Sequence, residues 1–186
     1  MSTSSYHHGD LRNALLGAAE RILDADVAST ISLRALAREV GVSHAAPYKH
    51  FASQDELRTE LARRWMVDFI DAQEHAVTGT DAGADLLAAG LAYVDWAAEH
   101  PFRFALVFDP ALNRGTGAGQ LATQAARHEQ LLQHLVAAAI QAGVLTGPVE
   151  VTGQWLWAVV HGLATLVILG QVPREAVPEV LRRTLA

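Results

Sequence analysis

One short segment of the chain carries side chains that could hydrogen-bond to DNA. His44 and Lys49 can donate hydrogen bonds, and the small residues between them would let a backbone come close to base edges. The segment consists of Ser43, His44, Ala45, Ala46, Pro47, Tyr48 and Lys49. We expect these residues to form a helix that projects its side chains outward, where it can enter a major groove.

Pro47 restricts the form of this helix. Proline has no amide donor and crowds the carbonyl group four residues earlier, so it is unusual in the middle of a helix. The sequence therefore predicts a helix that starts late, near Ala46, or one that is irregular.

The sequence lacks the motifs of the common enzyme classes. It has no Cys, no GxSxG nucleophile motif, no phosphate-binding loop and no HExxH motif. His7 and His8 are adjacent and diverge on a helix, and His128 and His134 face different ways because they are six residues apart. We expect no catalytic residues, no metal site and no cofactor.

The residues before the polar segment predict a helix that packs against a domain core. Apolar residues recur there at helical spacing, at Leu33, Leu36, Ala37 and Val40. Ser32 precedes this helix and Gly41 follows it as a C-terminal stop. Two short helices joined by a turn that contains Gly are typical of a helix-turn-helix unit. The same spacing also fits a helical hairpin with a purely structural role.

The rest of the sequence predicts an all-α protein of nine or ten helices. Ser53 to Glu56 forms a capping box and opens a long helix that reaches about residue 77. Further helices are expected over 84–99, 102–108, 121–142, 150–170 and 173–185. Residues 113–119 (NRGTGAG) are expected to form a flexible connection.

Charge is unevenly distributed along the chain. Residues 1–64 contain 8 basic and 8 acidic side chains, so the net charge of −6 arises from the remainder. A neutral N-terminal part on an acidic body is compatible with DNA binding, because the distribution of charge, and not the total, decides which surface can contact DNA. The polar N-terminus and the 16-residue apolar run 155–170 fit neither a secretory signal nor a membrane span. We therefore expect a soluble cytoplasmic protein with no membrane partner.

The first 60 residues resemble the TetR (tetracycline-repressor-like) family of bacterial transcription regulators. The resemblance rests on Tyr6 to Leu11 as the lead-in to the opening helix, on the helix-turn-helix from Ser32 to Phe51, and on Ser53 to Leu57. It implies an all-α fold with a DNA-binding domain over 1–53 and an effector-binding and dimerisation domain over 54–186. One departure is Gln54, where the family commonly has Lys.

Roles can be carried over residue by residue. By resemblance, Ser32 caps the second helix and touches a phosphate, with Arg34 beside it in the DNA-binding set. Tyr48 matches an aromatic residue whose hydroxyl group reaches the DNA backbone, and Ala46 and Pro47 match positions close to the bases.

Residues 157–164 (WAVVHGLA) look like the Trp-His-Gly signature of one C-terminal subfamily. Trp157 and His161 share a helical face, so His161 is either a core histidine or part of an effector pocket or dimer interface. Aromatic residues at helical spacing are candidates for the pocket as well as for the core. The expected pocket residues are Trp65, Phe69, Tyr93, Trp96, Phe102, Phe104, Phe108, Trp157 and His161.

The two long apolar helices over 121–142 and 150–170 must be buried, and we expect them to form the dimer interface. The expected interface residues are Leu131, Leu135, Trp155, Val159, Leu163 and Leu166. The sequence thus predicts a homodimeric regulator, most simply a repressor, that binds a palindromic operator in double-stranded DNA. A small hydrophobic effector would release it. The alternative is a helical protein–protein adaptor that does not bind DNA.

Overall fold

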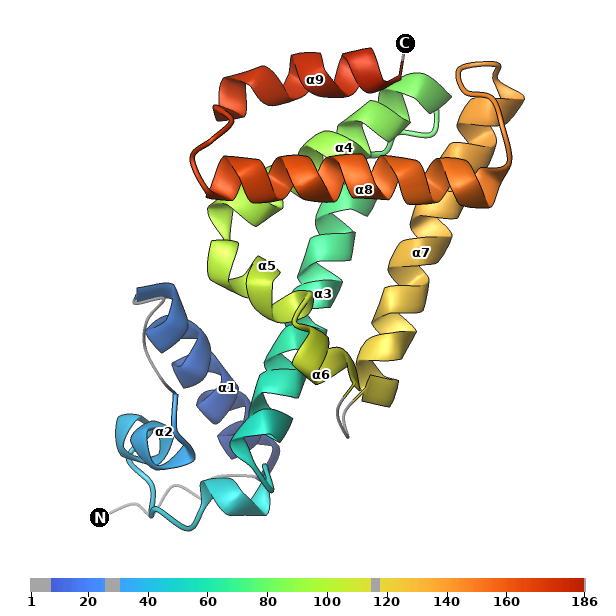
Figure 1. Ribbon diagram of the computed structural model, residues 1–186. Coiled ribbons are helices and arrows are strands. Elements are labelled where there is room, and N and C mark those ends of the chain that lie inside the picture. Colours follow the sequence, from blue (N-terminus) through green and yellow to red (C-terminus); the bar gives the residue numbers. More distant parts are fainter. Residues whose placement is uncertain (1–7, 26–30, 115–117, 186) are drawn as a thin grey trace.

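The computed structural model describes residues 8–25, 31–114 and 118–185, and every regular element in this part of the chain is helical (Figure 1). The α-helices are α1 (His8–Ala25), α2 (Leu33–Glu39), α3 (Gln54–Ala76), α4 (Ala82–Glu99), α5 (Pro101–Val107), α6 (Pro110–Arg114), α7 (Ala118–Gln141), α8 (Val149–Ile168) and α9 (Val177–Thr184). Two 3-10 helices, η1 (Pro47–Lys49) and η2 (Arg174–Ala176), complete the set. The predicted all-α fold is confirmed.

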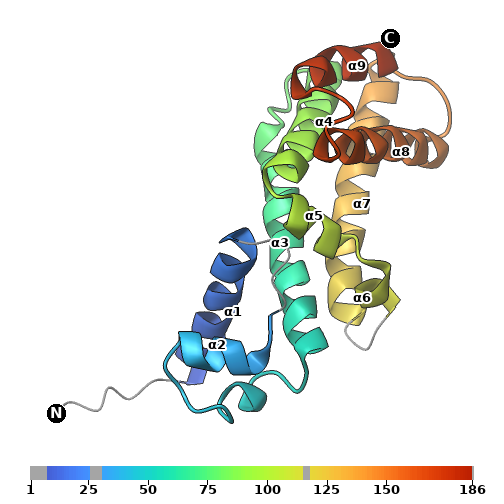
Figure 2. The same ribbon diagram turned by 60° about the vertical axis from the view of Figure 1, so that its left-hand side comes forward.

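The helices gather into two parts that share α3. The head consists of α1, α2 and η1, which pack around the N-terminal turns of α3. In the body, α4 and α7 pack on the C-terminal half of α3, α8 packs across α4 and α7, and α9 packs on α4 and α8. Helices α5 and α6 lie between the two parts (Figures 1 and 2). Residues 6 and 7 of the expected lead-in lie outside the described residues.

The long helix α3 begins where the sequence predicts. Ser53 is its N-cap, and its Oγ atom accepts a hydrogen bond from the Glu56 amide at 3.1 Å. The Glu56 carboxylate accepts one from the Ala52 amide at 2.6 Å, so each side chain satisfies a backbone donor at the helix start. The Ser53 half of the predicted capping box is confirmed, while Glu56 bonds the amide of the residue before the N-cap instead of that of Ser53. The helix ends at Ala76, close to the expected residue 77.

The turn after α2 also follows from the sequence. Gly41 adopts a positive φ of 71°, and the Val42 amide donates to the Ala37 carbonyl at 2.9 Å. This pairing satisfies carbonyl groups at the end of α2 and reverses the chain. After it, residues 43–46 form turns, and helical geometry begins only at Pro47. The second helix thus begins late, because proline is accommodated at a first helical position, and it is a 3-10 helix of only three residues.

Two C-terminal segments differ from expectation. The connection expected over 113–119 is shorter, because residues 113 and 114 end α6 and residues 118 and 119 begin α7. Helix α6 starts after Asp109, whose Oδ1 atom accepts a hydrogen bond from the Ala111 amide at 2.8 Å, with Pro110 at the first helical position. Residues 115–117 of the expected connection lie outside the described residues. The final helix is divided into η2 and α9, and Pro178 lies in the first turn of α9, where its missing amide costs no hydrogen bond.

Charged side chains join the head to the rest of the chain. Arg103 on α5 donates from Nε to Asp24 on α1 at 3.0 Å, and its guanidinium group lies 5.2 Å from the ring centroid of Trp65. Arg58 on α3 contacts Asp109 at 3.4 Å, just before α6. The position of α5 and α6 is therefore coupled to the head by ion pairs.

Glu60 is the best-buried carboxylate of these networks. It lies on α3 and contacts Arg12 of α1 at 3.2 Å, Arg63 at 2.8 Å and Arg64 at 3.6 Å. Burial alone would raise the pKa of Glu60, but hydrogen bonds from Arg63 and Arg12 outweigh it and lower the pKa from 4.5 to about 2.

We expect Glu60→Gln to lower the free energy of unfolding by about 2 kcal/mol at pH 7, the scale of hydrogen bonds to a charged group. Because the pKa of Glu60 is lower in the folded chain, its stabilisation is present above the ordinary pKa and is lost as pH falls from about 4.5 towards 2. Urea unfolding of both proteins between pH 7 and pH 2.5 measures this difference. An equal loss of stability on acidification in both proteins would contradict the assignment.

Candidate nucleic-acid interface and ligand cavity

The hairpin of α2 and η1 presents polar side chains to solvent at the end of the head distant from the body. Ser32 is the N-cap of α2, and its Oγ atom accepts a hydrogen bond from the Ala35 amide at 3.1 Å. Tyr48 is 50% exposed, which is unusual for a large aromatic residue. The other exposed members of the expected set are Arg34, Ser43, His44, Ala45 and Lys49. The structure thus brings most of the expected residues onto one hairpin.

Two of the expected residues lie less favourably for contact with DNA. Pro47 is buried in the head, and Ala46 is half-buried. The Pro47 carbonyl accepts hydrogen bonds from the His50 and Phe51 amides, at 2.9 and 3.0 Å. The expectation that Pro47 lies close to the bases is therefore corrected, since its side chain is covered by the protein.

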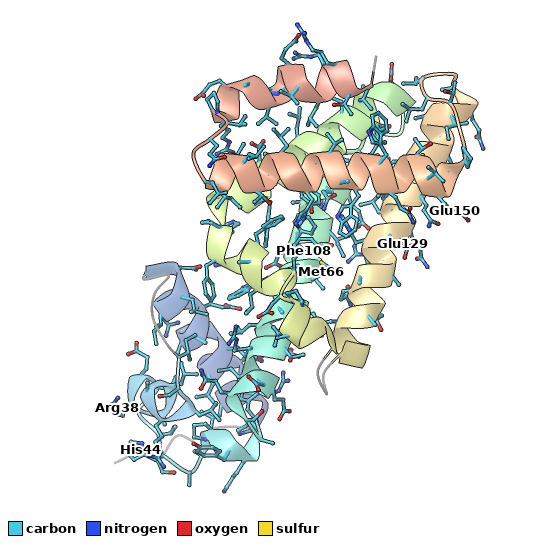
Figure 3. The ribbon with its side chains drawn as sticks, in the orientation of Figure 1. Arg38, His44, Met66, Phe108, Glu129 and Glu150 are labelled. Atoms are coloured by element: carbon cyan, nitrogen blue, oxygen red, sulfur yellow. The ribbon has the colours of Figure 1, made fainter. Side chains whose placement is uncertain are left out.

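Sequence reasoning missed Arg38. This residue is exposed in the last turn of α2, one helical turn after Arg34, and Figure 3 places it at the same end of the head as His44. The spacing of four residues between Arg34 and Arg38 was the available signal, because residues four apart lie on one helical face.

An aromatic cluster fills the body around Phe69 of α3. Ring centroids of Tyr93, Trp96 and Phe104 lie 4.7, 5.1 and 6.3 Å from that of Phe69, mostly edge to face. Such pairs stabilise a core beyond their buried area. Trp65 packs edge to face on Phe102, with centroids 6.2 Å apart. Most of the expected pocket aromatics are thus packed on one another.

His161 is held inside this cluster by a hydrogen bond. Its Nδ1 atom lies 2.7 Å from the hydroxyl oxygen of Tyr93, and its ring lies 4.9 Å from Phe108 and 5.8 Å from Trp157, centroid to centroid. Burial lowers the pKa of His161, which favours the neutral ring, and burial raises the pKa of Tyr93. Of the two alternatives left open by the sequence, these contacts favour the core histidine.

Two cavities lie beside the cluster. A small one of about 60 Å³ lies between α3, α4, α7, α8 and α9, and a larger cleft of about 440 Å³ lies between α3, α5, α7 and α8. Tyr93 lines the small cavity, Phe108 lines the cleft, and Trp157 lines both. The expected pocket residues that line neither of these two cavities are Trp65, Phe69, Trp96, Phe102, Phe104 and His161. For them the expectation is corrected, because they pack on one another.

Sequence reasoning missed His128, which lines both cavities. Its Nε2 atom lies 3.3 Å from Gln73 Oε1, and burial lowers the pKa of His128 to about 4. The ring is therefore neutral at pH 7 and does not bring a positive charge to either cavity.

The outer face of α8 is apolar and exposed. Trp155 is 47% exposed and Leu166 38%, and Val151 and Leu169, at 61% and 63%, extend the same stripe, which the sequence analysis did not single out. Among the described helices, only α8 is long and apolar enough to cross a membrane. The core helices of soluble proteins can have the same length and composition. An exposed apolar face of this kind marks a surface for association.

The other expected interface residues face inward. Leu135 and Leu163 are buried in the core of their own chain, 5% and 6% exposed. Leu131 and Val159 are half-buried and line the small cavity. The expectation for Leu135 and Leu163 is corrected, since the chain itself covers them.

Comparison with known proteins adds to these observations. A family model described as "Tetracyclin repressor-like, C-terminal domain" matches residues 86–186. An HTH-type transcriptional regulator of Mycobacterium tuberculosis is 31% identical over 131 residues, 67% of this chain and 53% of that protein. An uncharacterized HTH-type transcriptional regulator of Bacillus subtilis is 30% identical over 93 residues, 50% of this chain and 49% of that protein. The chain thus spans about half the length of these curated relatives.

Solved structures share the fold over nearly the whole chain. A protein of unknown function from a Rhodococcus species has a TM-score of 0.85 at 34% identity, covering 98% of this chain and 96% of that one. A TetR family transcriptional regulator from Thermus thermophilus has a TM-score of 0.67 at 19% identity, covering 92% and 94%. The second likeness concerns the fold alone.

We expect Tyr93→Phe to lower the free energy of unfolding by about 1 kcal/mol, because it removes a buried hydrogen bond and leaves His161 Nδ1 without this partner. Urea denaturation at pH 7 measures the change, and the aromatic packing is retained in the variant. Unchanged stability would contradict the importance of the Tyr93–His161 contact.

Proposed function

Because the chain belongs to the tetracycline-repressor-like (TetR) family of regulators, we propose that it binds operator DNA through the α2–η1 hairpin and regulates transcription. The observation that carries this proposal is the exposure of polar and cationic side chains on that hairpin, at the free end of the head. The curated relatives are named as helix-turn-helix transcriptional regulators, not as enzymes. Assignment to the subfamily with the Trp-His-Gly signature stays a prediction.

The contacts with DNA follow from the charge of the head. Arg34, Arg38 and Lys49 are exposed cations that can neutralise phosphates, and Tyr48 can donate its hydroxyl proton to a phosphate oxygen. His44 and the small residues beside it can approach base edges. The negative net charge lies in the body, which keeps DNA at the head.

Recognition of a palindrome requires two heads. Dimeric helix-turn-helix proteins read two half-sites about 34–36 Å apart, one turn of the double helix. The exposed stripe of α8 offers the surface for a second copy, with Trp155 and Leu166 at its centre and Val151 and Leu169 towards its ends. In this proposal Leu131 and Val159, which are half-buried, also belong to the interface.

Release by a small effector follows from the shared helix. Met66 on α3 lines the 440 Å³ cleft, and the same helix carries Leu57 and Leu61 in the core. A ligand that shifts α3 therefore changes the separation of the two heads, so that both half-sites can no longer be engaged. Arg103 and Asp24 transmit the same movement from α5 to α1.

The proposal gives each part of the chain one task. Residues 1–53 bind DNA, residues 54–186 bind the effector and form the homodimer, and the protein acts as a cytoplasmic repressor. Its partners are double-stranded operator DNA, a small effector and a second copy of the chain. In this proposal the apolar face of α8 meets that second copy and not a membrane.

We expect Tyr48→Ala to weaken operator binding at least tenfold, the scale of one hydrogen bond to a charged group. Lys49→Ala should weaken binding and reduce the slope of log K against log salt by about one unit, because one phosphate contact is lost. Gel-shift titrations with DNA flanking the gene, at several salt concentrations, measure both.

Arg183→Ala is the matched control for the loss of charge, since Arg183 is an exposed cation on α9. It should leave affinity and slope unchanged. If no specific gel shift is seen at any salt concentration, the result would instead favour the alternative, a helical adaptor that does not bind DNA.

We expect the double variant Trp155→Asp, Leu166→Asp to be monomeric at micromolar concentration, because it places four carboxylates in an apolar interface of two copies. Sedimentation equilibrium measures the mass, and circular dichroism checks the fold. Val144→Asp is the control, as Val144 is 39% exposed outside this stripe. A dimer of unchanged affinity would contradict the proposed interface.

A further inference from the structure

The 440 Å³ cleft has an apolar wall and an acidic rim. Its apolar residues come from four helices and the residue that follows α5, and they are Met66, Val107, Phe108, Ala125, Leu132 and Trp157. Figure 3 shows Met66 and Phe108 beneath α8, with Glu129 of α7 and Glu150 of α8 on the same side. The volume falls within the range of about 300–1,000 Å³ that small-molecule sites occupy.

The charged groups of the cleft are all of one sign. Glu129 and Glu150 are both exposed and both line the cleft, and none of its lining residues is Lys or Arg. The nearest arginine in sequence, Arg127, is held by Asp71 and Glu74 on α3. His128 is neutral at pH 7, as described above.

Neutral polar groups complete the rim. Gln133 donates a hydrogen bond from Nε2 to Glu129 Oε1 at 3.1 Å, which fixes the carboxylate without neutralising it. Gln154 and Gly153 lie on α8 between Glu150 and Trp157. Two exposed carboxylates thus line the same cleft as an aromatic and aliphatic wall.

From this complementarity we propose that the cleft binds an amphipathic organic cation, with its charge at Glu129 and Glu150 and its apolar part against Phe108, Met66 and Trp157. The proposal refines the expectation of a hydrophobic effector, and only its regulatory consequence rests on the proposed function above. A cation gains Coulomb attraction from both carboxylates and a cation–π contact with the indole ring, whereas an anion of the same shape is repelled.

The test uses two probes of the same shape and opposite charge. Tetraphenylphosphonium and tetraphenylborate are titrated into the full chain without DNA, and binding is measured by isothermal calorimetry. We expect the cation to bind at least tenfold more tightly than the anion. Equal binding of both ions, or tighter binding of the anion, would overturn the proposal.

Variants locate the binding site. Glu129→Gln with Glu150→Gln should weaken binding of the cation at least tenfold and leave the anion unaffected or better bound. The control is Glu39→Gln with Glu175→Gln, which removes two exposed carboxylates outside the cleft and should change the affinity less than twofold. Equal effects of both double variants would mean that the cation responds to net charge alone, and the proposal would fail.

The Trp157→Leu variant tests the contribution of the aromatic wall separately from that of the two carboxylates. It keeps an apolar side chain but removes the indole ring, so binding of the cation should weaken while the carboxylates remain in place. If the affinity of this variant for the cation is unchanged, the cation does not pack against the Trp157 ring and this part of the proposal is wrong. Circular dichroism of each variant checks that it is folded.

The two proposals can fail separately. If the cation binds as expected but the protein never shifts DNA, the proposed function is wrong and the site stands. If the protein binds its operator but the cation does not bind the cleft, only the present inference falls. If both hold, tetraphenylphosphonium should lower operator affinity in the gel shift for the natural chain and not for the Glu129, Glu150 double variant.

Discussion

The structure depends on the burial of one helix, α3, whose N-terminal part is covered by the head and whose C-terminal part is covered by the body. The side chains of α3 enter the core along its whole length, with Leu57 and Leu61 towards its N-terminus and Phe69 and Ile70 further along, all of them completely buried. At 1.5 Å per residue, such a helix is about 34 Å long. Neither part can move along α3 without exposing apolar surface, so head and body are connected by a rigid element and not by a linker (Figure 2).

Electrostatic contacts determine how the head sits on this helix. Glu60 is buried among arginines from α1 and α3, and its charge would be expensive to leave without partners. Arg103 adds a second connection, since it pairs with Asp24 while it covers the ring of Trp65. The Arg103–Asp24 contact therefore connects α5, beside the cleft, to α1. In the proposed function, this contact would couple ligand binding to the geometry of the head.

The local features of the fold were predictable because neighbouring residues decide them. Ser53 and Glu56 satisfy backbone donors within one turn, and Gly41 permits a positive φ that other residues rarely adopt. Pro47 lies at the first position of the second helix of the hairpin for an equally local reason, because its missing amide is tolerated there and not further along. The helix at 110–114 was missed because its start depends on a side-chain cap in a segment rich in loop-forming residues.

The candidate site was predictable only in part. The sequence pointed to the exposed hairpin correctly for Tyr48, His44 and Lys49, because polar residues next to a tight turn have few ways of being buried. It could not separate pocket from core among the aromatic residues, since helical spacing defines a face but not what covers it. Phe69 and Phe104 meet each other, while Phe108 also reaches the cleft.

By itself the sequence determined most of the helices, the Ser32 and Ser53 caps, the hairpin and the family resemblance, all of which depend on residues close together in the chain. Tertiary structure alone decided that Leu135 and Leu163 are covered while Trp155 and Leu166 are exposed. It also brought Glu129 and Glu150, on different helices, to one cleft. The reason is that contacts between helices depend on which faces meet, and the periodicity of a single helix does not contain that information.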